Sequence, residues 1–158
     1  MNTQLTITSL MKHAERVNGA VEVVSVTADN PRHRYTYREA FLRARKLANA
    51  LVALGLKPGD TVATFAWNDY RHLEIYYAVS CSGMICHTIN PRLFPEQIDY
   101  IVNHGRDQWI FVDATIVPLL EKLQDSMPEV KGFVVMTDAA HMPSTSLRNA
   151  LCYEDIIA

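Results

Sequence analysis

One stretch, residues 61–91, constrains the fold more than any other part of the chain. It opens with a short apolar, β-branched run at 61–67, which is typical of a buried strand. Asn68 is a good helix N-cap, apolar residues then recur at helical spacing, and Gly83 can end the helix in a left-handed conformation. A second apolar run at 84–89 predicts another buried strand. A strand, a helix and a strand joined by short links form a βαβ unit, which requires parallel strands.

The alternation of strands and helices continues beyond this unit. Helices are expected at 95–105, at 116–124 and from Tyr153 onward, and buried strands at 109–112 and 132–136. Thr115 is expected to cap the helix at 116–124, and the polar stretch 137–149 is expected to be a loop. The chain is therefore predicted to have an α/β fold, with a mostly parallel sheet flanked by helices.

The N-terminal part of the chain precedes this alternating region and has a different pattern. Apolar residues at helical spacing predict a helix at 5–18. An extended run at 21–27 is expected to pair with 34–36 as an antiparallel hairpin. Thr36 and Glu39 fit a capping box, which indicates that the next helix begins directly after the hairpin.

The composition is that of an ordinary globular protein. The chain has 158 residues, of which 49% are hydrophobic and 20% charged, and its formal net charge is −2. That charge gives no electrostatic basis for binding nucleic acid or an anionic membrane surface, and no apolar run approaches the ~20 residues that span a bilayer. The first residues lack the pattern of a secretory signal, and three cysteines without a CxxC motif are typical of reduced thiols. We expect a cytoplasmic protein without a transmembrane segment.

Ligands of open α/β sheets bind outside the carboxyl ends of the strands. In this sequence those positions are Trp67 and residues 87–92. Trp67 is more typical of a core residue than of a ligand platform. His87 has two open interpretations, a residue near a ligand and a structural histidine. His72 and His104 lie on expected helices, where a structural role is the usual case.

Motifs for a self-contained active site are missing from the sequence. It has no GxxxxGK[ST] phosphate loop, no GxGxxG fingerprint, no GxSxG elbow and no HExxH motif. All six glycines are isolated, so no glycine-rich loop can surround a phosphate with backbone amides. The residues alone therefore predict an α/β domain without a complete catalytic centre.

Several stretches resemble characteristic segments of acyl-adenylate-forming enzymes. Residues 34–40 resemble their R-x-T-Y-x-E-L opening, residues 54–63 their L-G-V-x-P-G-D-R-V-A segment, and residues 86–98 their N-P-R-L segment. Residues 66–68 and 100–104 are similar to the corresponding segments of one branch, the medium- and long-chain fatty-acid–CoA ligases. The chain thus looks like the N-terminal portion of such an acyl-CoA synthetase, in the AMP-binding superfamily.

The resemblance implies a two-step reaction in the parent enzyme. ATP and a fatty acid give an acyl-adenylate and pyrophosphate, with Mg²⁺ balancing phosphate charge, and coenzyme A then displaces AMP to give the thioester. The family's ATP phosphate loop, adenine motif, magnesium-coordinating glutamate and C-terminal lysine have no counterpart in these 158 residues. We therefore expect an N-terminal fragment, truncated before the phosphate loop, that is inactive alone and binds none of these cofactors.

The resemblance also implies one binding residue and one partner. In related ligases the arginine of the N-P-R-L segment lies near a nucleotide phosphate of coenzyme A, which points to Arg92 as a cofactor-binding residue. A surface arginine that caps a neighbouring helix is the alternative, and no catalytic or metal-binding residue is assigned. Related ligases can dimerise through their N-terminal domains. We therefore expect a homodimer, with residues 1–36 (helix and hairpin) as the dimerisation segment and 37–158 as the α/β N-terminal subdomain.

Two other interpretations stay open. The chain could be a fragment of another acyl-adenylating enzyme that acts on an aryl or short-chain acid. It could also be a free-standing, non-catalytic α/β binding domain.

Overall fold

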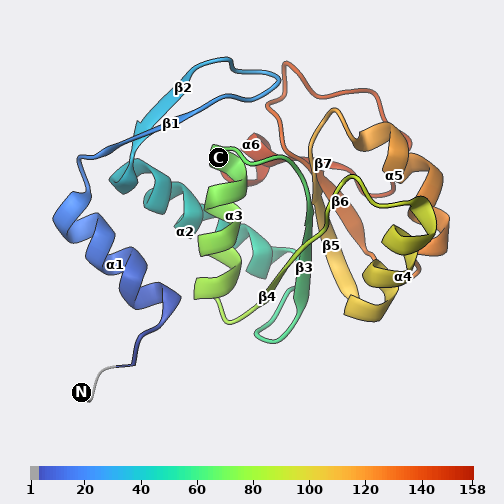
Figure 1. The fold of residues 1–158 in the computed structure, drawn as a ribbon, viewed down its shortest axis with the longest axis horizontal. Helices are drawn as coiled ribbons and strands as arrows, with labels where there is room; N and C mark the ends of the chain where they lie inside the picture. Colours follow the sequence, from blue (N-terminus) through green and yellow to red (C-terminus); the bar gives the residue numbers. More distant parts are fainter. Residues whose placement is uncertain (1–3) are drawn as a thin grey trace.

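The computed structural model describes residues 4–158 and contains a five-stranded, fully parallel sheet (Figure 1). The order of the strands across the sheet is β4-β3-β5-β6-β7. Their bounds are β3 Thr61–Phe65, β4 Ile85–Thr88, β5 Asp107–Val112, β6 Gly132–Val135 and β7 Leu151–Cys152. The predicted α/β fold with a parallel sheet is confirmed.

The strand order reverses direction once. In the register of the sheet, Thr64 of β3 lies opposite Thr88 of β4 on one side and Phe111 of β5 on the other. The chain therefore moves outward from β3 to the edge strand β4 and then crosses back to β5. The carboxyl ends of β3 and β5 form a topological switch point, the position at which open α/β sheets bind ligands.

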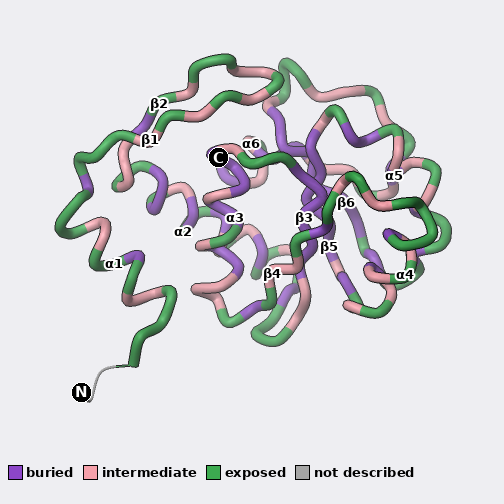
Figure 2. The backbone as a smooth tube through the Cα atoms, viewed as in Figure 1, coloured by how far each residue is buried: buried purple, intermediate pink, exposed green. Residues whose placement is uncertain are grey.

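Helices cover both faces of the sheet (Figure 1). On one face lie α2 Tyr37–Ala53, α3 Tyr70–Cys81 and α6 Tyr153–Ile156, and on the other lie α4 Pro95–Gly105, α5 Val117–Leu123 and the short 3-10 helix η1 Gln124–Ser126. Side chains of one strand alternate between these layers, since Phe111 packs with the first set and Ile110 with the second. Burial on both faces explains the continuous apolar runs of the central strands (Figure 2).

The edge of the sheet departs from the prediction. Strand β4 was expected to be buried, yet Ile85 is 53% exposed and no residue of β4 is fully buried. The expectation is wrong because β4 has a neighbour on one side only, so its outer flank faces solvent. Strand β7 was not predicted, since a two-residue strand gives no periodic signal.

An antiparallel hairpin and a helix precede the sheet, as predicted. Helix α1 spans Ile7–Asn18, and strands β1 Glu22–Ser25 and β2 His33–Thr36 pair with each other. The buried rings of Tyr35 on β2 and Tyr70 on α3 meet edge to face. This aromatic contact holds the hairpin against the amino end of α3.

Several helix ends follow the sequence signals. Thr36 and Glu39 form the predicted capping box, with the Thr36 amide donating to Glu39 Oε2 over 2.7 Å and the Glu39 amide donating to Thr36 Oγ1. Gly55 and Gly83 follow α2 and α3 with φ of 85° and 74°, the left-handed region that favours glycine.

The start of one helix differs from the prediction by one residue. The N-cap of α3 is Asp69 rather than Asn68, because Asp69 Oδ1 accepts from the His72 amide over 2.8 Å. Helix α4 ends at Gly105, as predicted, and the left-handed residue after it is Arg106, with φ of 52°. Neighbouring residues of similar capping propensity cannot be ranked from sequence alone.

Candidate functional site

The candidate site lies at the topological switch point, where Trp67 follows β3 and Thr115 follows β5. The Trp67 indole N–H donates to Thr115 Oγ1 over 3.2 Å, so one hydrogen bond crosses from the end of one strand to the end of the other. Thr115 in turn donates from its hydroxyl to Asp113 Oδ1 over 2.6 Å. Asp113 is only 7% exposed, so this chain of bonds is anchored in the buried part of the molecule.

The structure changes the interpretation of two of these residues. Trp67 was expected to be a core residue, but it is 45% exposed, because the chain leaves the sheet two residues earlier than the apolar run suggests. Thr115 was expected to cap the next helix, but Ile116 is the N-cap residue of α5 and the Thr115 hydroxyl serves Asp113 and Trp67 instead. Sequence reasoning did not single out Asp113. The sequence feature that could have identified Asp113 is its position, because it is a polar residue directly after a buried strand.

Arg92, the predicted binding residue, lies beside Trp67. Its backbone amide donates to Asn90 Oδ1 over 3.0 Å, which shapes the turn after β4. Its guanidinium carbon is 6.0 Å from the centroid of the Trp67 ring, at the outer limit of a cation–π contact. Within residues 4–158 the Arg92 guanidinium has no hydrogen-bond or ion-pair partner, so it is available to an anion.

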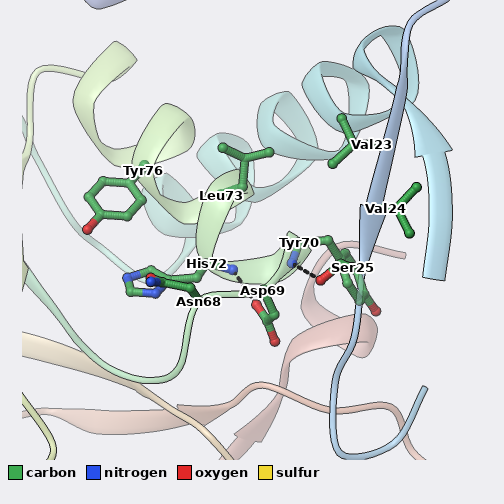
Figure 3. Close-up of a pocket in the computed structure, with 9 residues that line it drawn as sticks. All are labelled: Val23, Val24, Ser25, Asn68, Asp69, Tyr70, His72, Leu73 and Tyr76. Atoms are coloured by element: carbon green, nitrogen blue, oxygen red, sulfur yellow. Dashed lines mark hydrogen bonds between the residues drawn. The ribbon is translucent and has the colours of Figure 1, made fainter. Parts of the chain in front are cut away.

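A groove of about 340 Å³ lies next to this site, between the hairpin and α3. Figure 3 shows side chains of β1 on one side of the groove and side chains of α3 on the other. Asp69 lines both this groove and a second, smaller pocket of about 180 Å³ that lies between the hairpin turn and the loops after β5 and β6. Burial raises the pKa of Asp69 to about 6.

The raised pKa of Asp69 predicts a pH-dependent stability. A carboxyl whose folded-state pKa lies above its unfolded value stabilises the fold below about pH 4, and that contribution is lost as the pH rises through about 6. Asp69→Asn keeps an N-cap acceptor and removes the buried charge. We expect this variant to raise the free energy of unfolding by about 1 kcal/mol at about pH 8 and to leave it unchanged at about pH 4.

Urea unfolding at both pH values measures this effect, and Asp125→Asn, which changes an exposed carboxylate, is the matched control. A loss of stability in Asp69→Asn at the higher pH would show that the charge of Asp69 is favourable at the helix N-terminus.

Buried ion pairs fix the hairpin turn beside the site. Arg71 of α3 is 2% exposed and lies 2.9 Å from Asp29 in the turn between β1 and β2, and 2.9 Å from Glu154 of α6. Burial opposes ionisation of Asp29, but hydrogen bonds from Arg71 and Thr27 outweigh it and lower the pKa of Asp29 to about 2. The hairpin is therefore tied electrostatically to the same edge of the sheet as the candidate site.

His72 and His87 each contact partners within the fold. His72 is buried, with Nδ1 3.1 Å from the Trp67 carbonyl oxygen and Nε2 2.9 Å from Thr64 Oγ1, and burial lowers its pKa. Its predicted structural role is confirmed. His87 reaches toward the amino end of β5, where its Nδ1 is 2.9 Å from the fully buried Asp107. The geometry supports the structural interpretation of His87 over the ligand-contacting one.

One group of side chains is spaced closely enough to bind a metal ion, but its carboxylates already have partners within the protein. Ligand atoms of Asp29, Asp138 and His141 lie within 4.8 Å of one another. However, Arg71 already neutralises Asp29, and His141 Nδ1 is 2.7 Å from Asp138 Oδ1. We therefore assign no metal to this group. No helix within residues 4–158 combines the length and the apolar character that crossing a membrane requires.

The fold and the switch-point site define a class, the open parallel α/β domains that bind ligands at the carboxyl ends of their strands. The crystal structure of the anthranilate CoA ligase AuaEII in complex with anthranoyl-AMP superimposes with a TM-score of 0.83, and the match covers 99% of this chain and 28% of that one. At 21% sequence identity this likeness shows the fold alone.

Residues 10–155 match the family model described as AMP-binding enzyme, and the chain belongs to that family. It is 50% identical to the medium-chain-fatty-acid–CoA ligase of Ectopseudomonas oleovorans over 157 residues, which are 99% of this chain and 29% of the relative. It is 51% identical to the 3-methylmercaptopropionyl-CoA ligase of Ruegeria lacuscaerulensis over 136 residues, which are 86% of this chain and 25% of the relative. The chain thus spans between a quarter and a third of the length of these relatives.

Proposed function

We propose that the chain is the N-terminal part of an ATP-dependent fatty-acid–CoA ligase. The observation that supports this most directly is 50% identity, over nearly the whole chain, to a medium-chain-fatty-acid–CoA ligase. In the proposed reaction a fatty carboxylate attacks the α-phosphorus of ATP to give acyl-adenylate and pyrophosphate, and the thiolate of coenzyme A then displaces AMP. Mg²⁺ neutralises the phosphates of ATP in the first step.

In the proposed ligase, the residues of this chain form the parallel sheet and one side of the surface that binds coenzyme A. The parallel sheet places Trp67, Arg92 and Thr115 at one edge, while the chain has no phosphate loop that could orient ATP. Adenylation chemistry is therefore assigned to parts of the ligase outside these residues. The exposed guanidinium of Arg92 is proposed to hold a nucleotide phosphate of coenzyme A through charge-assisted hydrogen bonds.

The role of Arg92 is tested in the complete ligase by separating the two half-reactions. Arg92→Ala is expected to leave ATP–pyrophosphate exchange nearly unchanged and to raise the KM for coenzyme A roughly ten- to a hundredfold, because the contact exists only in the second step. Arg92→Lys should recover part of the loss, since it keeps the charge without the planar fork.

Two outcomes contradict this role. Loss of both half-reactions together with a lower melting temperature would mean that Arg92 is structural. Unchanged kinetics in both variants would mean that Arg92 does not contact coenzyme A.

A short-chain acid is the second candidate substrate. The relative named 3-methylmercaptopropionyl-CoA ligase is as similar to this chain as the medium-chain ligase is. Pyrophosphate release by the complete ligase with carboxylic acids of increasing length decides between the two. A preference for short acids would replace the fatty-acid assignment.

We also propose that the ligase is a cytoplasmic homodimer that associates through residues 1–36. Support comes from large apolar side chains in and next to α1 and the hairpin that remain exposed, namely Leu5, Ile7, Leu10, Val17, Val21, Val24 and Val26. The three cysteines are free thiols, which agrees with a reducing compartment. Sedimentation of this chain and of a variant without its first 36 residues tests the association.

A further inference from the structure

The Trp67 indole is an unusual surface feature. It is 45% exposed although it lies only two residues after Phe65, the last residue of the largely buried strand β3, and it stands at the switch point of the sheet. An exposed tryptophan in such a position presents a large aromatic surface at the place where α/β sheets bind nucleotides and other ligands.

Hydrogen bonds hold the ring in one orientation. The indole N–H is fixed by Thr115, whose hydroxyl is fixed by the buried carboxylate of Asp113. Because the N–H already has a partner, the parts of the ring that remain available are its apolar faces. A ring that is ordered before binding loses little conformational entropy when a ligand stacks on it.

A cationic group completes the surface. The Arg92 guanidinium lies 6.0 Å from the ring centroid, and its donors are unpaired within residues 4–158. At this distance the contact with the ring is weak, so the guanidinium can turn toward an anion. An aromatic plane beside a free arginine matches a ligand that has both a planar base and a phosphate.

We propose that Trp67 stacks on the purine base of a nucleotide whose phosphate is bound by Arg92. The inference rests on the proposed function in one respect, since coenzyme A, with its adenosine 3′-phosphate, is then the natural source of that nucleotide. ATP has the same base and also bears phosphates, so the experiment separates the two sources. Asp113 and Thr115 act as positioning residues for the indole.

The test uses the fluorescence of the 158-residue chain. Trp67 and Trp109 are its two tryptophans, and Trp109 is only 6% exposed, so Trp109→Phe leaves the exposed indole as the single reporter. Adenosine 3′,5′-bisphosphate is expected to quench this fluorescence saturably, and ribose 5-phosphate is expected to leave it unchanged. If Trp109→Phe does not fold, the two indole N–H signals of the unsubstituted chain in an NMR titration serve as the reporter, assigned with Trp67→Phe.

Matched variants separate the base from the phosphate, with binding followed by calorimetry. Trp67→Ala is expected to weaken binding of adenosine 3′,5′-bisphosphate about five- to a hundredfold, while Tyr100→Ala, which removes another exposed aromatic ring, leaves it unchanged. Thr115→Val removes the acceptor of the indole N–H and should weaken binding in the same direction. Coenzyme A should bind more tightly than ATP, and the reverse order would assign the surface to ATP.

The outcomes distinguish this inference from the proposed role of Arg92. If the indole of Trp67 does not respond to the bisphosphate, stacking is refuted, whether or not Arg92→Ala weakens phosphate binding. If the bisphosphate changes the indole signal equally in the unsubstituted chain and in Arg92→Ala, the inference that Arg92 binds the phosphate of the stacked nucleotide is refuted. Only an aromatic contact then remains. Saturable quenching that requires both side chains supports the inference.

Discussion

Replacing Arg71 by methionine is expected to lower the free energy of unfolding by about 3–5 kcal/mol. Arg71 is almost fully buried and forms ion pairs with both Asp29 and Glu154. Methionine keeps much of the side-chain volume, but it leaves the carboxylate of Asp29, which is 8% exposed, without its cationic partner. Urea unfolding of the 158-residue chain at neutral pH measures the loss.

An exposed arginine provides the matched control. Arg34 also pairs with a carboxylate, that of Glu22, but the two side chains are 43% and 50% exposed. Arg34→Met is therefore expected to change stability by less than about 1 kcal/mol. Adding Asp29→Asn to Arg71→Met should recover part of the loss, because it removes the unpaired charge. Equal effects of Arg71→Met and Arg34→Met would mean that burial gives the Arg71 pairs no special importance.

Acid should remove the same contribution in the unsubstituted protein. The folded-state pKa of Asp29, about 2, lies below the value near 4 of an unfolded chain. The stabilisation from Asp29 is therefore present above about pH 4 and is lost as the pH falls through about 2.

Replacing Phe111 by alanine is expected to lower the free energy of unfolding by about 3–5 kcal/mol. Phe111 lies on the central strand β5, is fully buried, and meets the Tyr153 ring edge to face at a centroid distance of 6.1 Å. The substitution leaves a cavity between the sheet and α6 that neighbouring side chains fill only in part. Urea unfolding measures the change in stability.

Phe94→Ala is the control for the same change of side chain at the surface. Phe94 is 72% exposed, so its removal should shift stability by no more than about 0.5 kcal/mol. A small effect at Phe111 would show that the core relaxes around the missing ring.

The sequence was informative where burial and periodicity act on several neighbouring residues together. Strands β3, β5 and β6, the helices between them and the N-terminal hairpin were predicted, because alternation of strand and helix leaves few arrangements other than a parallel sheet. The position of Arg92 at an edge where ligands bind was also expected, since it follows a strand of that sheet.

The arrangement of the site was beyond sequence reasoning for physical reasons. The exposure of Trp67 depends on the exact residue at which the chain leaves β3, and its contact with Thr115 depends on β5 returning next to β3. Both are consequences of tertiary packing, and no local pattern encodes them. The buried partners of Arg71 lie on segments that are distant in the sequence, so its burial gave no local signal.

The ion pairs of Arg71, together with a neighbouring pair between Arg43 and Glu154, have a consequence for synthesis on the ribosome. Arg43 and its partner Glu154 are 111 residues apart, and Thr137 and Asp29, which also meet, are 108 residues apart. At ordinary translation speeds, roughly 5–20 s separate the appearance of such partners. During that interval the hairpin and the first helices have emerged from the ribosome. Charged side chains that the folded protein buries still lack the partners that lie later in the sequence. These long-range contacts can therefore form only after the last segments of the domain have been synthesised.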